Sequence, residues 1–559
     1  MGRHRHVAAS CKFLLMLGLF SASSLLAANK LSAELQGLSP AAPVDAIVQF
    51  KRSPSATDLA AVDRAGGLLR QTFRRIHGAL VTVRAGQLNA LAANPNVVYI
   101  SPDRKVSGNL EFAEPTVNAN IALQYGWTGT GVGVAIIDSG IYNHLDLRQR
   151  IVYSESFVPG DSSTEDAYGH GTHVAGIVAG NGASSTGPNF TYTFRGIAPQ
   201  AELINLRALD SNGQGSDSSV INAIERAIEL KDAWNIRIIN LSLGRTVFES
   251  YTLDPLCQEV EKAWQAGLVV VVAAGNNGRD NSMGTSGYAT ITAPGNDPYV
   301  ITVGAMKDMG TTTRADDLIA SYSSKGPTLL DHVVKPDLVA PGNSIVSALA
   351  PGAAITSLYS GNAVPVSYYT KGNNSNGSYA YFRLNGTSMA APMVSGAAAL
   401  VLQRQPWLTP DQVKARLMKT ATKNFPSTSV VTDPVTGISY TSTYDLFTIG
   451  AGYLDVWAAL NNTDVATGPA LSPTAIYDTM SGNTLVVSDS ASVWQDTIVW
   501  GTTIVWGTNV IVNNEAIVWG TAIVWGTNTS SAFTIVWGST VVWGTSNPFP
   551  QALAFRGDN

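Results

Sequence analysis

The sequence has only two cysteines among its 559 residues, Cys11 and Cys257. Cys11 lies within residues 1–28, which have the basic start, apolar run and small closing residues of a secretory signal peptide. Removal of that segment leaves Cys257 alone and excludes an intramolecular disulfide, so stability must come from core size or bound ions. No histidine lies near Cys257 in the sequence, which favours a buried structural thiol over a nucleophile.

Charged residues are also scarce, at 13% of the chain against 45% hydrophobic residues, a balance typical of a globular protein. After residue 28 no segment has the ~20 consecutive apolar residues of a membrane-spanning helix, so we expect no transmembrane anchor. Residues 1–110 hold 13 basic and 5 acidic side chains, whereas the remainder holds 22 and 35. A basic leader before an acidic body suggests docking of the leader on the body, and argues against nucleic acid as a partner.

The pattern of apolar residues divides the rest of the chain. Residues 29–110, with a core at 44–106, alternate strand-like and helix-like stretches, as in a small α+β unit. Over residues 111–462, apolar runs alternate with helical stretches, which predicts an α/β domain with a mostly parallel central sheet. The expected strands of the first unit are 44–51, 78–85 and 96–103; those of the α/β domain are 131–140, 201–209, 236–244, 268–278 and 299–306.

Residues 463–559 differ in composition from the rest. Seven of the twelve tryptophans lie between 494 and 543, mostly in a repeated [IV]VWGT, and only Asp496 and Glu515 are charged between 494 and 545. Short β-branched runs separated by Gly-Thr predict a β-repeat tail. We favour tryptophans that form the core of this layer; stacking on glycans or surfaces and self-association are the alternatives.

Three motifs supply the residue types needed for nucleophilic acyl transfer. Asp138 ends an apolar run before Ser-Gly-Ile, His170 lies in GHGTHVAG, and Ser388 lies in NGTSMAAP, where a turn meets a helix of small residues. A serine hydroxyl is a poor nucleophile at neutral pH, so an imidazole must accept its proton and a carboxylate must orient that imidazole. We therefore assign Ser388 as nucleophile, His170 as general base and then acid, and Asp138 as the group that orients His170.

Two further polar residues bear on this chemistry. Asn276, at the end of the apolar run before Asn-Gly, is positioned to donate its side-chain amide to an oxyanion, although it would also suit a turn. His173 follows His170 by three residues, a spacing that places both on one helix face. A metallohydrolase built on this pair is an alternative, but no acidic or cysteine ligand set accompanies it, so we expect His173 to be a packed structural residue.

In combination, DSGI, HGTHVAG and GTSMAAP in the order Asp–His–Ser resemble the subtilisin-like serine endopeptidases (subtilases) over roughly residues 120–460. The resemblance implies a subtilisin-like three-layer fold, an inhibitory and folding-assisting propeptide at 29–110, and its autocatalytic removal. It also implies two walls of a substrate pocket. One wall is Ser242, Leu243 and Gly244, which line the substrate backbone, and the other is Ala273, Ala274 and Gly275.

The chain departs from the family pattern at several positions. Arg245 follows Ser-Leu-Gly where many relatives carry a small residue, so we expect a more basic pocket rim. Thr292 aligns near the pocket base and would make the pocket shallower. Asp146 matches a calcium-ligand position of some relatives, so a structural calcium is an open expectation, whereas catalysis requires no cofactor.

The sequence therefore predicts a secreted serine endopeptidase, monomeric, with protein or peptide substrates and its own propeptide as partners. A rival hypothesis is a cell-surface adhesion protein with a decayed catalytic domain, whose Trp-rich tail carries the main function. The presence of all four catalytic elements, Asp138, His170, Asn276 and Ser388, speaks against that decay.

Overall fold

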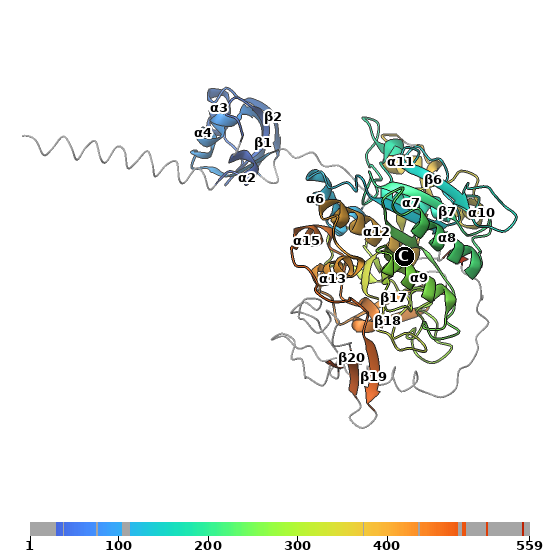
Figure 1. The fold of residues 1–559 in the computed structure, drawn as a ribbon. Coiled ribbons are helices and arrows are strands. Elements are labelled where there is room, and N and C mark those ends of the chain that lie inside the picture. Colours follow the sequence, from blue (N-terminus) through green and yellow to red (C-terminus); the bar gives the residue numbers. More distant parts are fainter. Residues whose placement is uncertain are drawn as a thin grey trace, which may run out of the picture. The chain divides into compact units, whose positions relative to one another are not determined.

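The computed structural model describes residues 30–102, 112–478, 483–487, 510–512 and 551–552, except 37, 74–76, 373 and 434–435. The predicted signal peptide and the tryptophan repeats between 494 and 543 lie outside the described residues. The chain forms two units, residues 1–106 and residues 107–559, which are coloured along the sequence in Figure 1. Among the described helices, none has the length and apolar character needed to cross a membrane.

The first unit is an antiparallel sheet of four strands in the order β2-β3-β1-β4, with helices and a hydrophobic core of its own. The three expected strands form, as β1, β3 and β4. The sequence reading missed β2, whose residues are mostly exposed and so show no clear apolar alternation. The elements are α2 (Ala33–Gln36), β1 (Pro43–Phe50), α3 (Ala56–Arg64), β2 (Leu68–Phe73), β3 (Gly78–Arg84), the 3-10 turn η1 (Ala85–Gln87), α4 (Leu88–Ala92) and β4 (Val97–Pro102).

The second unit is built on an eight-stranded sheet in which all neighbours are parallel except β11 and β12. Its buried strands consist mostly of Val, Ile, Leu and Ala, as expected for a sheet covered on both faces. This confirms the mostly parallel sheet, although edge strand β6 was not predicted. In spatial order the strands are β12 (Leu318–Ile319), β11 (Ile301–Lys307), β10 (Val269–Ala273), β8 (Ile236–Leu241), β5 (Gly133–Asp138), β7 (Glu202–Arg207) and β6 (Ile151–Ser156), with β13 (Leu338–Pro341) also on β11.

Helices complete a three-layer α/β arrangement around this sheet (Figure 1). Helices α8 (Asp217–Glu229) and α9 (Pro255–Gln265) pack together and against the sheet. Helices α7 (His170–Ala179) and α12 (Thr387–Arg404) form a second packed pair. All residues of α12 from Thr387 to Leu402 are buried, because the helix is apolar or small on every face and so lies in the core rather than at the surface.

Smaller elements surround the sheet. A three-stranded antiparallel sheet, a hairpin and a three-stranded group with one antiparallel and one parallel pair flank it, and a two-residue strand, β9, pairs with β22. The strands are β9 (Leu243–Gly244), β14 (Ile345–Ala348), β15 (Ala363–Pro365), β16 (Gly377–Leu384), β17 (Thr428–Thr432), β18 (Ser439–Thr443), β19 (Thr474–Asp478), β20 (Asn483–Val487), β21 (Val510–Val512) and β22 (Gln551–Ala552). The remaining helices are α5 (Ala113–Thr116), α6 (Ala119–Gln124), α10 (Ala354–Leu358), α11 (Val366–Tyr369), α13 (Pro410–Thr420), α14 (Leu446–Ile449) and α15 (Val456–Asn461), with 3-10 turns η2 (Ala183–Ser185) and η3 (Ser360–Asn362).

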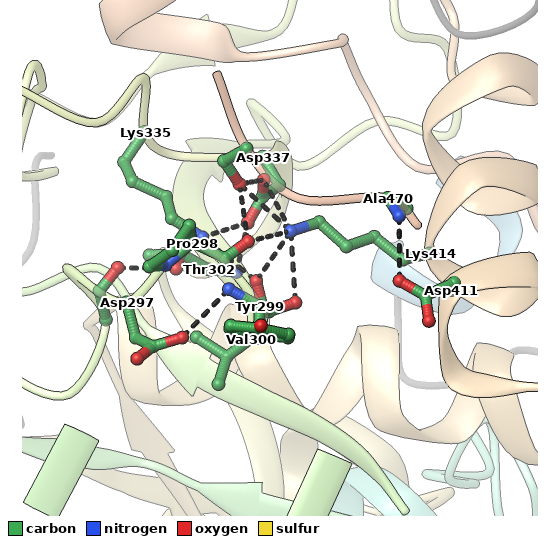
Figure 2. A network of polar contacts seen from close by, with 12 residues as sticks. Asp297, Pro298, Tyr299, Val300, Thr302, Lys335, Asp337, Asp411, Lys414 and Ala470 are labelled. Carbon is green, nitrogen blue, oxygen red and sulfur yellow. Dashed lines mark hydrogen bonds and ion pairs between the residues drawn. The ribbon is translucent and has the colours of Figure 1, made fainter. Parts of the chain in front are cut away.

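A cluster of buried charged residues joins the segment after α15, which contains Ser472, to the α/β domain through hydrogen bonds (Figure 2). Asp337 accepts from Lys335 at 2.7 Å and lies 3.3 Å from the ammonium of Lys414, and all three side chains are fully buried. Lys414 also donates to the carbonyls of residues 298, 299 and 300 and, at 2.9 Å, to Ser472 Oγ. Ser472 in turn donates to Asp337 at 2.5 Å. The predicted boundary at 462 therefore precedes a segment that is bonded to the α/β body.

Candidate active site

Asp138 is placed by the topology of the sheet. Strand β5 lies between β7 and β8, and the chain passes from one side of β5 to the other after β7. Such a reversal leaves a crevice at the carboxyl ends of the strands, where ligands bind in open α/β sheets. Asp138 is the last residue of β5 and is buried at this edge.

His170 begins α7 and is bonded to Asp138. Its Nδ1 lies 2.8 Å from Oδ1 and 3.0 Å from Oδ2 of that carboxylate. The neighbouring glycines permit the approach: Gly169 has φ of 103°, and a Cβ at Gly171 would lie 3.1 Å from Cβ of Asp138 and would clash with a backbone carbonyl. Nε2 of His170 is buried and has no hydrogen-bond partner in the described part of the chain, so this nitrogen is the one available to a nucleophile.

Ser388 is the second residue of α12, and its hydroxyl is bonded to Ser242, the residue before β9. Oγ of Ser388 donates to the carbonyl of Ser242 at 3.0 Å, while Oγ of Ser242 donates to the carbonyl of Ser388 at 2.9 Å. None of the hydrogen bonds among the described residues joins Ser388 to His170. The Ser388 proton must therefore be redirected from the Ser242 carbonyl to the imidazole, and catalytic hydrogen bonds that tighten only when substrate binds are common in unliganded sites.

Asn276 follows β10 and is fixed to the start of α12. Its Oδ1 accepts from the backbone N–H of Thr387 at 2.9 Å and from the Thr387 hydroxyl at 3.1 Å. The same hydroxyl accepts from the backbone N–H of Gly275 at 3.1 Å. The Asn276 side chain is thus oriented through its Oδ1 atom, which is bonded to Thr387, the residue before Ser388.

The six residues predicted to line the substrate lie on the two segments that the sequence suggested. Ser242 precedes β9, which contains Leu243 and Gly244, and Ala273 ends β10 before Ala274 and Gly275. Thr292 lies against both segments. A Cβ at Gly244 would lie 2.5 Å from Thr292 Oγ1, and one at Gly275 would lie 2.9 Å from Thr292 Cγ2. The side chain of Thr292 therefore packs directly against both glycines.

The expectation of a basic pocket rim is wrong. Arg245 is buried, and its guanidinium donates to Asp217 at 3.0 Å and to both oxygens of Asp254 at 2.8 and 2.9 Å. Two carboxylates on α8 and at the N-cap of α9 thereby neutralise it, and Arg245 joins these helices to β9. Neither carboxylate is close to Arg245 in sequence, so the reading of the motif alone did not find the pairing.

Asp166 is a structural residue of the site that the sequence analysis missed. Its carboxylate accepts from the backbone N–H groups of Gly169 at 2.6 Å and Thr172 at 2.7 Å, and from Ser139 Oγ at 2.8 Å. Burial raises the pKa of Asp166, and these hydrogen bonds oppose that effect. Because Ser139 follows Asp138, Asp166 ties the end of β5 to the start of α7. The available signal was an acidic residue shortly before GHGTH.

The two histidines of the motif have different environments. Nε2 of His173 lies 3.1 Å from the carbonyls of both Ile345 and Phe382, away from the Asp138–His170 pair. Burial lowers the pKa of His173 to about 3, so the ring is neutral. The described residues contain no group of three or more His, Cys, Asp or Glu arranged to hold a metal ion. The metallohydrolase alternative therefore has no shared ligand set here.

Asp146 and Cys257 have structural contacts. One oxygen of Asp146 accepts from the backbone N–H of Ser184 and the other from Tyr381 OH, each at 2.7 Å. Asp146 belongs to no group of three or more His, Cys, Asp or Glu among the described residues, and a structural calcium there stays an expectation. Cys257 is a buried free thiol bonded to Asn296, and burial raises its pKa, which confirms a structural role.

Comparison with known proteins gives consistent matches. A family model described as the subtilase family matches residues 129–437. Serine protease AprX of Bacillus subtilis (strain 168) is 38% identical over 362 residues, which is 63% of this chain and 76% of that protein. Subtilisin E of the same strain is 34% identical over 385 residues (67% and 84%), and subtilisin DY of Bacillus licheniformis is 36% identical over 309 residues (55% and 90%). The region matched by the family model contains Asp138, His170, Asn276 and Ser388.

Proposed function

Because the chain belongs to the subtilase family and is a serine-type endopeptidase, we propose that Asp138, His170 and Ser388 are its catalytic triad. The observation that carries this proposal is the pair of short contacts between Asp138 and His170 Nδ1 with Nε2 left unbonded. This arrangement fixes the tautomer in which Nδ1 carries the proton and Nε2 accepts one. The nucleophile comes from α12, which packs on α7.

The reaction follows from these positions. Ser388 Oγ attacks the carbonyl carbon of the scissile bond while its proton passes to Nε2 of His170, and the carbonyl oxygen becomes an oxyanion. The backbone N–H of Ser388 and the amide of Asn276 donate to that oxyanion. The C–N bond then breaks as His170 protonates the leaving amine. Water, activated by His170, hydrolyses the acyl-enzyme and restores the Ser388 hydroxyl, so the side chains suffice without a cofactor.

Replacement of the nucleophile tests the assignment. Ser388→Ala should abolish hydrolysis of casein and labelling by a fluorophosphonate, and in the wild type the label should be recovered on the peptide that contains Ser388. If folded Ser388→Ala protein still hydrolyses casein and a chelator inhibits that hydrolysis, the metallohydrolase hypothesis would be supported instead.

We further propose that residues 29–110 are a propeptide removed by the enzyme itself. The support is that this unit has its own sheet and core, separate in the chain from the α/β unit. The Ser388→Ala chain should keep its leader after purification, whereas wild-type protein should lose it, as shown by mass and N-terminal sequence. Loss of the leader from purified Ser388→Ala protein without added protease would contradict self-processing.

Secretion is proposed from residues 1–28, whose pattern is that of a signal peptide. Fusion of this segment to a reporter should export it, and deletion from the full chain should retain the protein in the cell. The adhesion hypothesis rests on the tryptophan repeats alone, and the similar proteins named above are peptidases.

We also propose a preference for small side chains at the residue that provides the scissile carbonyl. The support is the position of Thr292, whose hydroxyl and methyl groups contact both pocket walls at Gly244 and Gly275. A side chain inserted between the walls meets Thr292 first, and an aromatic ring there would overlap it.

A further inference from the structure

Residues 551–552, near the end of the sequence, form a strand on β9. Strand β22 pairs antiparallel with β9, with Gln551 opposite Gly244 and Ala552 opposite Leu243. Arg245, which follows β9, pairs with Ala293 instead: the N–H of Arg245 donates to the carbonyl of Ala293 at 3.0 Å, and the N–H of Ala293 donates to the carbonyl of Arg245 at 2.8 Å. A segment near the end of the sequence thus takes the edge of β9.

The direction of this pairing leads towards the nucleophile. From Gln551 to Ala552 the tail passes Gly244 and then Leu243, so it runs towards Ser242. The carbonyl of Ser242 is the group that holds Ser388 Oγ at 3.0 Å. An extended peptide that pairs with β9 in this sense is therefore guided along its backbone to the reacting hydroxyl.

We propose that the C-terminal segment containing Gln551–Ala552 is an intramolecular, substrate-like ligand of β9 that competes with peptide substrates. The inference rests on the proposed function, because competition matters only if β9 binds substrates. Backbone pairing to a strand edge depends little on side-chain identity, so the edge that accepts this segment accepts other extended peptides in the same direction. Two strands cannot pair with one edge at the same positions.

The covalent link makes the competition effective. A ligand tethered to its own site meets that site at an effective concentration set by its linker, so even a weak pairing competes with free substrate. Substrates must displace the tail, which raises the apparent KM and leaves kcat unchanged. The tail then sets the substrate concentration at which the full chain becomes active.

The test uses two full-length double variants. Gln551→Pro with Ala552→Pro removes both backbone N–H groups of β22, whereas the matched control Gln551→Ala with Ala552→Ser keeps them. Both are made in a Ser388→Ala background, so that no proteolysis occurs, and hydrogen exchange of the peptide containing residues 243 and 244 is measured. We expect exchange about 10-fold faster in the proline variant than in the control. Equal exchange in the two variants would overturn the proposal.

The same pair is then made with Ser388 intact, and KM and kcat are measured on a short chromogenic peptide with C-terminal integrity checked by mass. A KM several-fold lower in the proline variant, with equal kcat, supports competition by the tail; equal KM values contradict it. If the wild-type chain shows no peptidase activity at all, the proposed function fails, while the exchange experiment still decides whether the tail pairs with β9.

Discussion

Ser388 and Ser242 exchange two hydrogen bonds: each side-chain hydroxyl donates to the main-chain carbonyl of the other residue, at 3.0 and 2.9 Å. The Ser242 hydroxyl also accepts from Asn240 Nδ2 at 2.9 Å. The end of β8 and the start of α12 are therefore joined beside the nucleophile. The acceptor of the Ser388 hydroxyl is a backbone carbonyl, which no side-chain substitution removes.

Replacement of Ser242 should lower the stability of the protein much more than its catalytic activity. Ser242→Ala leaves the Ser388 carbonyl and the Asn240 amide without a buried partner, so the free energy of unfolding should fall by about 1–3 kcal/mol. Activity should fall much less than in Ser388→Ala, because the proton-transfer groups remain. Denaturant unfolding in a Ser388→Ala background and peptide hydrolysis in the active background measure the two effects; complete loss of turnover in stable Ser242→Ala protein would contradict this division.

The two histidines should respond differently to alanine. His170→Ala should lower kcat by at least about 10³-fold in a protein with normal stability, a scale that comes from substitutions in the relative subtilisin. His173→Ala should mainly reduce the yield and stability of folded protein, because it removes the Nε2–H donor that the carbonyls of Ile345 and Phe382 share. Circular dichroism, thermal unfolding and kinetics on both variants check the asymmetry. Similar catalytic loss from both, with both folded, would count against it.

His173 should also make stability depend on acidity. Its pKa is about 3 in the folded protein because of burial, against 6.5 for an ordinary histidine, so between these values the unfolded chain binds the proton and the folded one does not. The contribution of His173 to the free energy of unfolding is therefore fully present above pH 6.5. It decreases as the pH falls from 6.5 towards 3, by up to about 1.4 kcal/mol per pH unit. Unfolding of wild type and His173→Gln, both with Ser388→Ala, should show a shallower pH slope for the His173 variant between pH 4 and 6.5.

Lys414 should be far more important for stability than its helix neighbour Lys419. Below pH 7, where Lys414 is charged in the folded protein, Lys414→Met leaves three carbonyls and Asp337 without their buried cation, which should cost about 3–5 kcal/mol. Lys419 pairs with Asp464 at the surface, so Lys419→Met should cost at most about 1 kcal/mol. Denaturant midpoints of the two variants give the comparison; equal costs would show that the cluster around Asp337 is not a stabilising centre.

Burial lowers the pKa of Lys414 to about 7, against 10.5 for an ordinary lysine. Between these values the unfolded chain binds a proton that the folded one releases, so the contribution of Lys414 to stability rises from pH 7 to 10.5. The difference in stability between wild type and Lys414→Met should therefore widen over that range.

Thr292 should control the size of the accepted side chain. Thr292→Gly removes the hydroxyl and methyl groups that contact both walls and should raise kcat/KM for substrates with phenylalanine before the scissile bond by about 10–200-fold relative to alanine. Paired chromogenic peptides that differ only at that residue provide the measurement. An unchanged ratio in active Thr292→Gly protein would place the base of the pocket elsewhere.

Residues whose partners are local or periodic were predictable from the sequence. The apolar runs ending at Asp138 and before Asn276 became β5 and β10, because buried parallel strands need continuous apolar residues. Arg245 was misjudged because its charge is cancelled by Asp217 and Asp254, which lie on other elements. Asp166 was missed because a carboxylate that organises a helix start through backbone N–H groups has no sequence signature beyond its proximity.

Long-range contacts limited the rest. The pairing of Ser472 with Lys414 and that of Ala552 with Leu243 join residues 58 and more than 300 positions apart, and neither segment has a pattern that identifies its partner. The amino-acid composition does change after residue 462, but residues beyond that position, such as Ser472, still form hydrogen bonds to the α/β domain.

The contact between Asn276 and Thr387 has a mechanical consequence. The carbonyl end of Asn276 is held by the residue immediately before Ser388, so the proposed oxyanion donor and the proposed nucleophile are linked through two hydrogen bonds. Hydrogen bonds through Thr387 hold these two residues together, whereas none among the described residues joins Ser388 to His170 on α7. Disturbances far from the site should therefore reach catalysis through the proton-transfer step and leave oxyanion stabilisation intact.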